Sequence, residues 1–109
     1  YGITGGNTFI VLNNIVANCE YTALRRVDYH SVIAHILLWN NGRDNDGSNL
    51  SGIGLVRGDP KLDDAWQPAA DSPCLDAGTA HFEWPDMAPL VIPNDGFEGS
   101  APDLGAAER

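Results

Sequence analysis

Basic residues are scarce in this sequence, which has 6 Lys and Arg against 15 Asp and Glu in 109 residues and a formal net charge of −9. Binding to nucleic acids or to anionic lipid surfaces depends on clustered Lys and Arg. The sequence also lacks an apolar run near the roughly 18 residues that a membrane-spanning helix requires. Its first residues lack the basic region and the cleavage site of a signal peptide. We therefore expect neither nucleic acid nor a membrane as a partner.

Cysteine is also rare, because only Cys19 and Cys74 are present. Two cysteines permit one disulfide, but their spacing does not decide between a bridge and two free thiols. Hydrophobic residues make up 43% of the chain, which is enough for it to fold. At this length the chain can build one modest core. We expect a single structural unit.

The composition changes near Gly58. All seven prolines lie at or after Pro60, whereas eight of the nine asparagines lie before residue 50. Residues 1–57 hold four acidic residues and four arginines, so the whole negative charge falls in residues 58–109. The unit therefore has two parts of different character, residues 1–57 and residues 58–109.

The first part has the composition of β-strands. The segments TFIVLNNIVANC and YHSVIAHILLWNN are rich in β-branched and aromatic residues and are interrupted by Asn rather than by helix caps. An offset of 22 residues aligns Ile10 with Val32, Leu12 with Ala34, Ile15 with Leu37, Val16 with Leu38, and Asn18 with Asn40. A repeat of about 22 residues fits one coil of a β-solenoid, in which parallel strands of successive coils stack on one another.

Two details of this repeat bear on the fold. Asn18 above Asn40 predicts a ladder of side-chain amides at a corner of the coil. The Ile15/Leu37 series and the Val16/Leu38 series are both apolar, so the alternation does not decide which series points inward. Parallel strands that are covered on both faces have this pattern.

The second part contains four segments that belong together by resemblance: GDPKL at 58–62, WQPAADSPCLDAGTA at 66–80, NDG at 94–96 and APDLGAAE at 101–108. They resemble the closing segment of secreted right-handed parallel β-helix proteins, a group that includes many pectate-lyase-like polysaccharide lyases. The match covers roughly residues 27–108. It departs from the usual pattern at Lys61, where Leu is usual, at PND before Gly96, where Asp-x-Asp is usual, and at Ala107, where an aromatic residue is usual.

The resemblance implies a fold and a location. The fold is all-β, with the last coils of a right-handed parallel β-helix, a β-solenoid, in residues 1–57. A terminal strand and an irregular, Pro-rich C-terminal cap follow in residues 58–109. The protein is then secreted and extracellular or at the cell surface.

Two turn-like segments, SPCLDAG at 72–78 and PDLGAAE at 102–108, share the pattern Asp, one residue, Gly. Pro73 fixes its own φ, Asp76 is suited to accept backbone N–H groups, and Gly78 is suited to a positive φ. The resemblance implies that such turns lay the tail along the last coils and protect an open edge from pairing. We expect a structural role in the cap, rather than a catalytic one, for Asp59, Pro73, Asp76, Gly78, Asp103, Gly105 and Glu108.

A pectate-lyase-like enzyme needs carboxylates that hold Ca²⁺ and a basic residue that removes a proton. The candidate catalytic residues are Arg25, Arg26 and His30, and Arg43 and His35 are further choices for the base or for contact with a substrate carboxylate. The candidate calcium ligands are Asp44, Asn45 and Asp46, although such residues are also ordinary turn formers. The segment GRDNDG at 42–47 does not begin an EF-hand loop, because Gly42 and Ile53 would then occupy the first and last ligand positions, where carboxylates are needed. Calcium is the only cofactor that these residues suggest.

Three tryptophans, Trp39, Trp66 and Trp84, are candidates for stacking on sugar rings, or else they fill the seam between coil and cap. A solenoid needs about three repeats, with a cap at each end. This sequence supplies about two repeats and the rear cap. We therefore expect it to be incomplete on its N-terminal side, where a second copy or an upstream polypeptide covers the front coil.

Two functions fit these expectations. The chain is the C-terminal coil-and-cap portion of an extracellular β-helix protein that acts on or binds acidic polysaccharide in its full-length form. Alternatively, it is a non-enzymatic adhesive or assembly module whose open front coil pairs with another chain. A third hypothesis is that the chain is a small independent calcium-binding or glycan-binding domain. Within residues 1–57 no acidic position repeats at the 22-residue offset, so we expect this chain alone to lack activity even if the parent is a polysaccharide lyase.

Overall fold

A computed structural model of the chain describes residues 1–5, 10–27, 31–83, 89–93 and 99–105. These residues contain strands but no helix. The strands are β1 (Ile3–Thr4), β2 (Ile10–Ala17), β3 (Thr22–Arg25), β4 (Val32–Trp39), β5 (Arg43–Asp46), β6 (Val56–Arg57), β7 (His81–Phe82) and β8 (Leu90–Val91). The expected all-β class is thus confirmed. Over the same ranges there is no helix long and apolar enough to cross a membrane.

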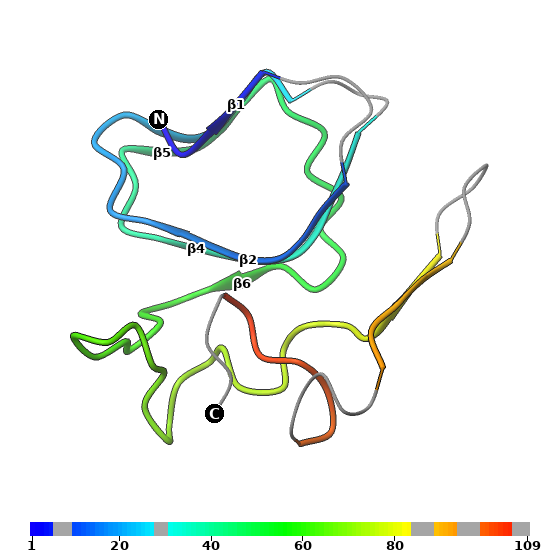
Figure 1. Cartoon of the computed structure of the whole chain (residues 1–109). Coiled ribbons are helices and arrows are strands. Elements are labelled where there is room, and N and C mark those ends of the chain that lie inside the picture. Colours follow the sequence, from blue (N-terminus) through cyan, green and yellow to red (C-terminus); the bar gives the residue numbers. More distant parts are fainter. Residues whose placement is uncertain (6–9, 28–30, 84–88, 94–98, 106–109) are drawn as a thin grey trace.

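Six of the strands form two parallel sheets, in the orders β1-β3-β5 and β2-β4-β6. The chain alternates between the two sheets, so each circuit adds one strand to both, and the circuits lie one behind another in Figure 1. In the β2–β4 pair, Ile10 lies beside Val32 and Val16 beside Leu38, which confirms the 22-residue offset. β5 and β6 continue this alternation over a shorter stretch of chain, with Leu37 of β4 beside Val56 of β6.

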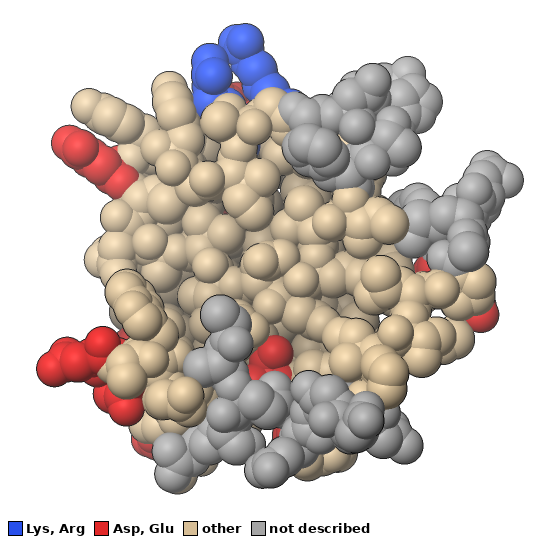
Figure 2. Space-filling model, viewed as in Figure 1, with Lys and Arg blue, Asp and Glu red and all other residues tan. Residues whose placement is uncertain are grey.

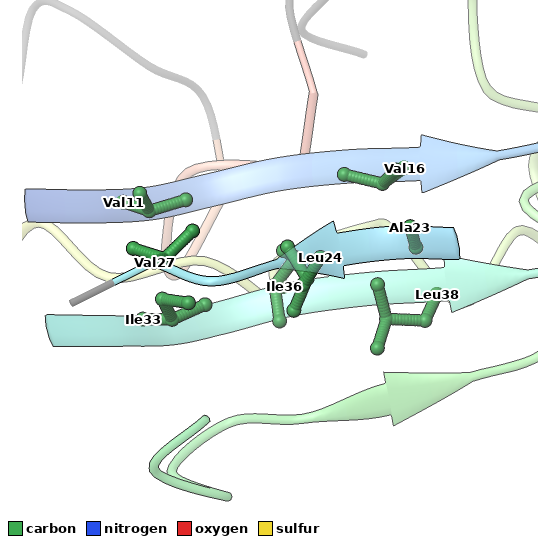
Figure 3. Packing of buried hydrophobic residues seen from close by; sticks show 8 residues of the cluster. All are labelled: Val11, Val16, Ala23, Leu24, Val27, Ile33, Ile36 and Leu38. Carbon is green, nitrogen blue, oxygen red and sulfur yellow. The ribbon is translucent and has the colours of Figure 1, made fainter. Parts of the chain in front are cut away.

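The main hydrophobic core lies between these two sheets. Figure 3 shows the side chains of this core, which come from β2, from β4, and from β3 together with a residue that follows it: Val11, Val16, Ala23, Leu24, Val27, Ile33, Ile36 and Leu38. The Val16/Leu38 series therefore points inward. Ile15 and Leu37 belong to a different cluster on the outer face of the β2-β4-β6 sheet.

A left-handed residue in the middle of each long strand sets this choice of faces. Asn13 in β2 and His35 in β4 have φ values of 61° and 48° and lie 22 residues apart. In a regular strand the side chains alternate, so residues 33, 35 and 37 would share a face. Because His35 breaks the alternation, Ile33 and Ile36 both point into the core. Asn and His are among the residues that tolerate this conformation best.

The predicted asparagine ladder is present at the end of the same strands. Asn18 and Asn40 also have positive φ, 61° and 54°, and Nδ2 of Asn40 donates to Oδ1 of Asn18 over 2.9 Å. The conformation turns the chain out of the sheet, while the side-chain amides bond from one circuit to the next. Asparagine favours this corner, because it adopts the left-handed backbone conformation more readily than most residues do.

The segment after β6, which we call the tail (residues 58–83, 89–93 and 99–105), covers the outer face of the β2-β4-β6 sheet (Figure 1). Cys74 and Leu104 of the tail pack with Leu37, and Phe82 packs with Val32 and Ala34. We expected the tail to protect an open strand edge, but these contacts are with a face. The reason is that β4 is apolar on both sides, so its outer face also needs cover.

Candidate functional site

The two turn-like segments pair with each other in the tail. The amide of Leu104 donates to Cys74 O over 2.9 Å, and the amide of Gly78 donates to Pro102 O over 2.8 Å. Between them, the amide of Asp76 donates to Oδ1 of Asp103 over 2.8 Å. Asp103 is buried, with 3% of its surface exposed. The similar sequences of the two segments therefore reflect a mutual contact, in which a buried carboxylate replaces a missing backbone acceptor.

The roles expected within these turns need correction. Asp76 itself has the positive φ, 53°, and offers its amide to Asp103. Gly78 does not have a positive φ, but a Cβ there would lie 2.8 Å from both Oδ1 of Asn13 and Pro102 O, so only glycine fits. Gly105 has a φ of 92°, as expected for the second turn. Pro73 lies within the first turn-like segment, and Glu108 lies outside the described residues.

Asn13 joins the tail to the coils. Its Nδ2 donates to Thr79 O over 3.0 Å, and its Oδ1 accepts the amide of Thr79 over 2.8 Å. Its carbonyl accepts the amide of Gly105 over 2.7 Å. One residue of β2 thus bonds both to the second turn-like segment, at Gly105, and to Thr79, which directly follows the first. Sequence reasoning missed Asn13, although an Asn that interrupts an apolar strand was a usable signal.

His35, one circuit further on, also lies against the tail. Its Nδ1 is 3.4 Å from Ala77 O, and its ring meets Phe82 edge to face with centroids 6.2 Å apart. A Cβ on Gly54 would lie 2.5 Å from Nδ1, so the ring is also enclosed on that side. His35 was a candidate for contact with a substrate carboxylate. Its position in this seam favours a structural role.

The candidate catalytic arginines lie on the other sheet. Arg25 is the last residue of β3, and its guanidinium carbon lies 4.9 Å from the ring centroid of Tyr1. The ring centroid of Tyr1 in turn lies 6.2 Å from that of Tyr21. Arg26 follows with a φ of 53° and an exposed side chain. His30 lies outside the described ranges, so its proposed catalytic role stays a prediction.

The three candidate calcium ligands lie in β5, where neighbouring side chains point to opposite sides. Oδ2 of Asp44 accepts Nε of Arg57 over 3.0 Å. The side chain of Asn45 bonds the amide and the carbonyl of Ser48. Asp46 is exposed. The part of the chain that the structure describes contains no group of three His, Cys, Asp or Glu that could hold a metal ion. The arrangement favours ordinary turn chemistry at residues 44–46.

A groove of about 660 Å³ lies where the ends of β2 and β4 meet residues 59–66 of the tail. Its lining brings together two of the three candidate stacking residues, Trp39 and Trp66. They are 40% and 73% exposed, which is high for tryptophan. Trp84 lies outside the described residues. We call this depression the Trp39–Trp66 groove, and it is the best candidate for a binding site in the described structure.

Two aspartates shape the loop that carries Trp66. Oδ1 of Asp59 accepts the amide of Lys61 over 2.9 Å. Oδ1 of Asp63 accepts the amides of Ala65 and Gln67 over 2.8 and 3.0 Å. Both aspartates also line the groove. Sequence reasoning gave Asp59 a structural role and missed Asp63, which a turn signal three residues before Trp66 could have indicated.

The basic group of this loop is paired on the surface. Nζ of Lys61 lies 2.7 Å from Oδ2 of Asp71. This hydrogen bond is the main reason that the pKa of Lys61 is raised and that of Asp71 lowered. Lys61 is not part of the groove lining. The charged side chains among the described lining residues are therefore the carboxylates of Asp59 and Asp63.

The two cysteines are free. Cys19 packs at the edge of the core between the sheets, whereas Cys74 is fully buried with Leu37 and Leu104. Burial raises the pKa of the Cys74 thiol, and Asp103 adds to the rise, while a hydrogen bond from Ser72 opposes it. A buried thiol with a raised pKa reacts slowly. Cys74 is thus a packing residue of the tail.

Comparison with protein-family models, curated proteins and solved structures finds no match to this chain.

Proposed function

We propose that this chain is the C-terminal coil-and-cap portion of an extracellular right-handed parallel β-helix protein, and that it binds polysaccharide. Support for the β-helix comes from parallel strands that stack with an offset of 22 residues and from the Asn18–Asn40 ladder. The pairing of the two turn-like segments over the outer face supports their role as a closing cap. In this proposal residues 1–57 are coils and residues 58–109 are the terminal strand and cap.

The main support for a binding function is the exposure of two tryptophans in one groove. Aromatic residues in a folded protein normally bury most of their surface, and exposed ones mark contact surfaces. Sugar rings present C–H groups that pack on an aromatic face and hydroxyls that bond to side-chain oxygens and amides. The groove offers both, because Asn18, Asp59 and Asp63 lie in its lining beside Trp39 and Trp66.

Binding is the activity proposed for this chain, and catalysis is not. Arg25 and Arg26 belong to the β3 side of the molecule, whereas the groove is formed by β2, β4 and the tail. In the full-length protein, action on acidic polysaccharide remains what the resemblance to polysaccharide lyases implies. Its catalytic groups would then come from other coils.

Replacing Trp66 by Ala is expected to weaken polysaccharide binding at least about tenfold, which corresponds to the loss of about 1.4 kcal/mol. Trp66 is 73% exposed, so the variant should keep its fold. The matched control is Tyr21→Ala, an aromatic residue that is 63% exposed and outside the groove. Affinity electrophoresis in gels that contain soluble glycans, followed by calorimetry, measures the effect. Equal retardation of Trp66→Ala and wild type would contradict the proposal.

A second function is favoured by the edge of the β2-β4-β6 sheet. β2 is eight residues long and pairs with β4 on one side only, and its first residue, Ile10, is 47% exposed. Long edge strands with apolar residues are suited to pair with another chain. In this reading the chain is a non-enzymatic assembly module.

If β2 mediates assembly, light scattering should give a defined multiple of 11.7 kDa for the purified chain. A charge at the edge, in Ile10→Lys, should return the mass to that of one chain, because charged edge residues oppose strand addition. The control is Ile53→Lys, which changes an equally exposed isoleucine outside the strands. A mass of 11.7 kDa at all concentrations would rule out self-assembly through β2.

A further inference from the structure

We infer that the Trp39–Trp66 groove selects uncharged glycans and rejects uronate chains. This inference rests on the proposed function, since it names the class of polysaccharide that the same groove binds. It differs from the acidic polysaccharide that the resemblance implies for the parent protein. The selection depends on the charge of the groove and on the hydrogen-bonding groups that its aspartates present.

The groove has carboxylates and amides but no basic group among its described lining residues. Lys61 follows Asp59 within two residues, yet its Nζ pairs with Asp71 outside the lining. On the face viewed in Figure 2, the basic side chains that are drawn lie at the edge next to the β1-β3-β5 sheet, while acidic side chains lie over the tail and at one side of the coils. Among the described lining residues, a uronate would therefore meet charged groups of its own sign and no Arg or Lys to pair with it.

The hydrogen-bonding groups of the groove also favour hydroxyls over carboxylates. In the described residues, the hydrogen bonds of Asp59 and Asp63 use Oδ1, which accepts backbone amides of the loop. The Oδ2 atoms are left to accept from a ligand. A sugar hydroxyl donates to such an oxygen, whereas an ionised uronate carboxylate can only accept. Two facing acceptors repel each other, and the repulsion is stronger where water is partly excluded.

The groove also has room and aromatic surface for more than one sugar. Trp39 extends from the end of β4 and Trp66 from the tail, so the two rings belong to different parts of the chain. Stacking on an aromatic face does not require a charged ligand. The selection against uronates therefore depends on the aspartates, and the affinity depends on the tryptophans.

Calorimetric titration of the whole chain tests this inference with two probes of equal length, a β-1,4-linked glucose hexasaccharide and hexagalacturonic acid. A chelator in the buffer prevents a divalent cation from bridging carboxylates. The expected result is a preference for the neutral probe of at least about tenfold at low salt. Raising the salt to physiological strength should narrow this preference, because screening weakens repulsion between exposed charges.

The variants Asp59→Asn and Asp63→Asn, singly and together, keep Oδ1 as an acceptor for the loop amides but remove the charge. The double variant should bind the acidic probe more tightly and reduce the preference to about threefold or less. The control is Asp46→Asn, which removes an exposed carboxylate from β5, outside the groove. If the double variant does not fold, the salt dependence of the wild type still tests the same repulsion.

Three outcomes separate the inference from the proposed function. Neutral binding that requires Trp66, with acidic binding that appears only in the double variant, supports both. Acidic binding equal to neutral binding and lost in Trp66→Ala overturns the inference and leaves the proposed function. Absence of binding to either probe, and to the soluble glycans of the gel assay, overturns both.

Discussion

Replacing Asn13 by Ala is expected to lower the free energy of unfolding by about 3 kcal/mol. The variant loses two hydrogen bonds to Thr79, each worth about 1 kcal/mol. Alanine is also strained at the φ of 61° that Asn13 adopts, which adds about 1 kcal/mol. The tail then loses its side-chain hydrogen bonds to β2, while the backbone bond from the Gly105 amide to Asn13 O remains. Urea unfolding followed by circular dichroism measures the change.

Two variants separate the hydrogen bonds from the strain. Asn13→Gly removes the side chain without backbone strain, so about 2 kcal/mol of the loss should remain. Asn18→Ala has the same φ of 61° but loses only the exposed bond to Asn40, and we expect it to cost about 1–2 kcal/mol. Equal losses for Asn13→Ala and Asn18→Ala would show that Asn13 does not hold the tail.

Leu104→Ala is the second variant with a large expected effect, a loss of about 2–5 kcal/mol. Leu104 is 1% exposed and packs with Cys74 of the tail and Leu37 of β4. Truncation removes apolar contacts from both the tail and the sheet and leaves a cavity between them. Chemical denaturation gives the free energy, and hydrogen exchange shows where protection is lost.

The matched control is Leu90→Ala, the same change in β8, where Leu90 is 37% exposed. Its cost should stay below about 1 kcal/mol, because little buried surface is lost. In Leu104→Ala the amides of Asp76 and Gly78 should exchange faster, whereas those of β4 should be affected less. A cost for Leu104→Ala no greater than that for Leu90→Ala would contradict the packing of the tail on the sheet.

The proposed glycan binding is coupled to stability through Leu104 and Gly105. Both residues line the Trp39–Trp66 groove. Leu104 also packs in the cluster on the outer face of the sheet, and the amide of Gly105 bonds Asn13 O. The groove therefore depends on a docked tail, and Leu104→Ala should weaken glycan binding as well as folding. Trp66→Ala should affect binding alone, which distinguishes the two kinds of residue.

The strand pairing was the most predictable feature of the fold. Residues 22 apart carry similar side chains in β2 and β4, and parallel stacking places like on like. The inward series was not predictable from alternation, because Asn13 and His35 break it within the strands. A single left-handed residue exchanges the two faces of everything after it. The position of this exchange along the strand is known only from the backbone φ values of the structure.

The tail was predicted less well, for reasons that can be traced to single residues. Asp76 and Asp103 occupy similar sequences, but one supplies an amide and the other the carboxylate that accepts it. Gly78 is required by the close approach of Asn13, which lies far away in the sequence. The groove also depends on long-range packing, because Trp39 and Trp66 line one groove only when the tail is docked on the sheet. Long-range contacts of this kind leave no local pattern.

The docking of the tail on the outer face of the β2-β4-β6 sheet is tested most directly by nuclear Overhauser effects in solution. We expect cross peaks between the methyl groups of Leu104 and Leu37, and between the Thr79 amide proton and the side-chain amide of Asn13. Cross peaks confined to the coils and to the tail, with none between them, would contradict both the fold and the groove.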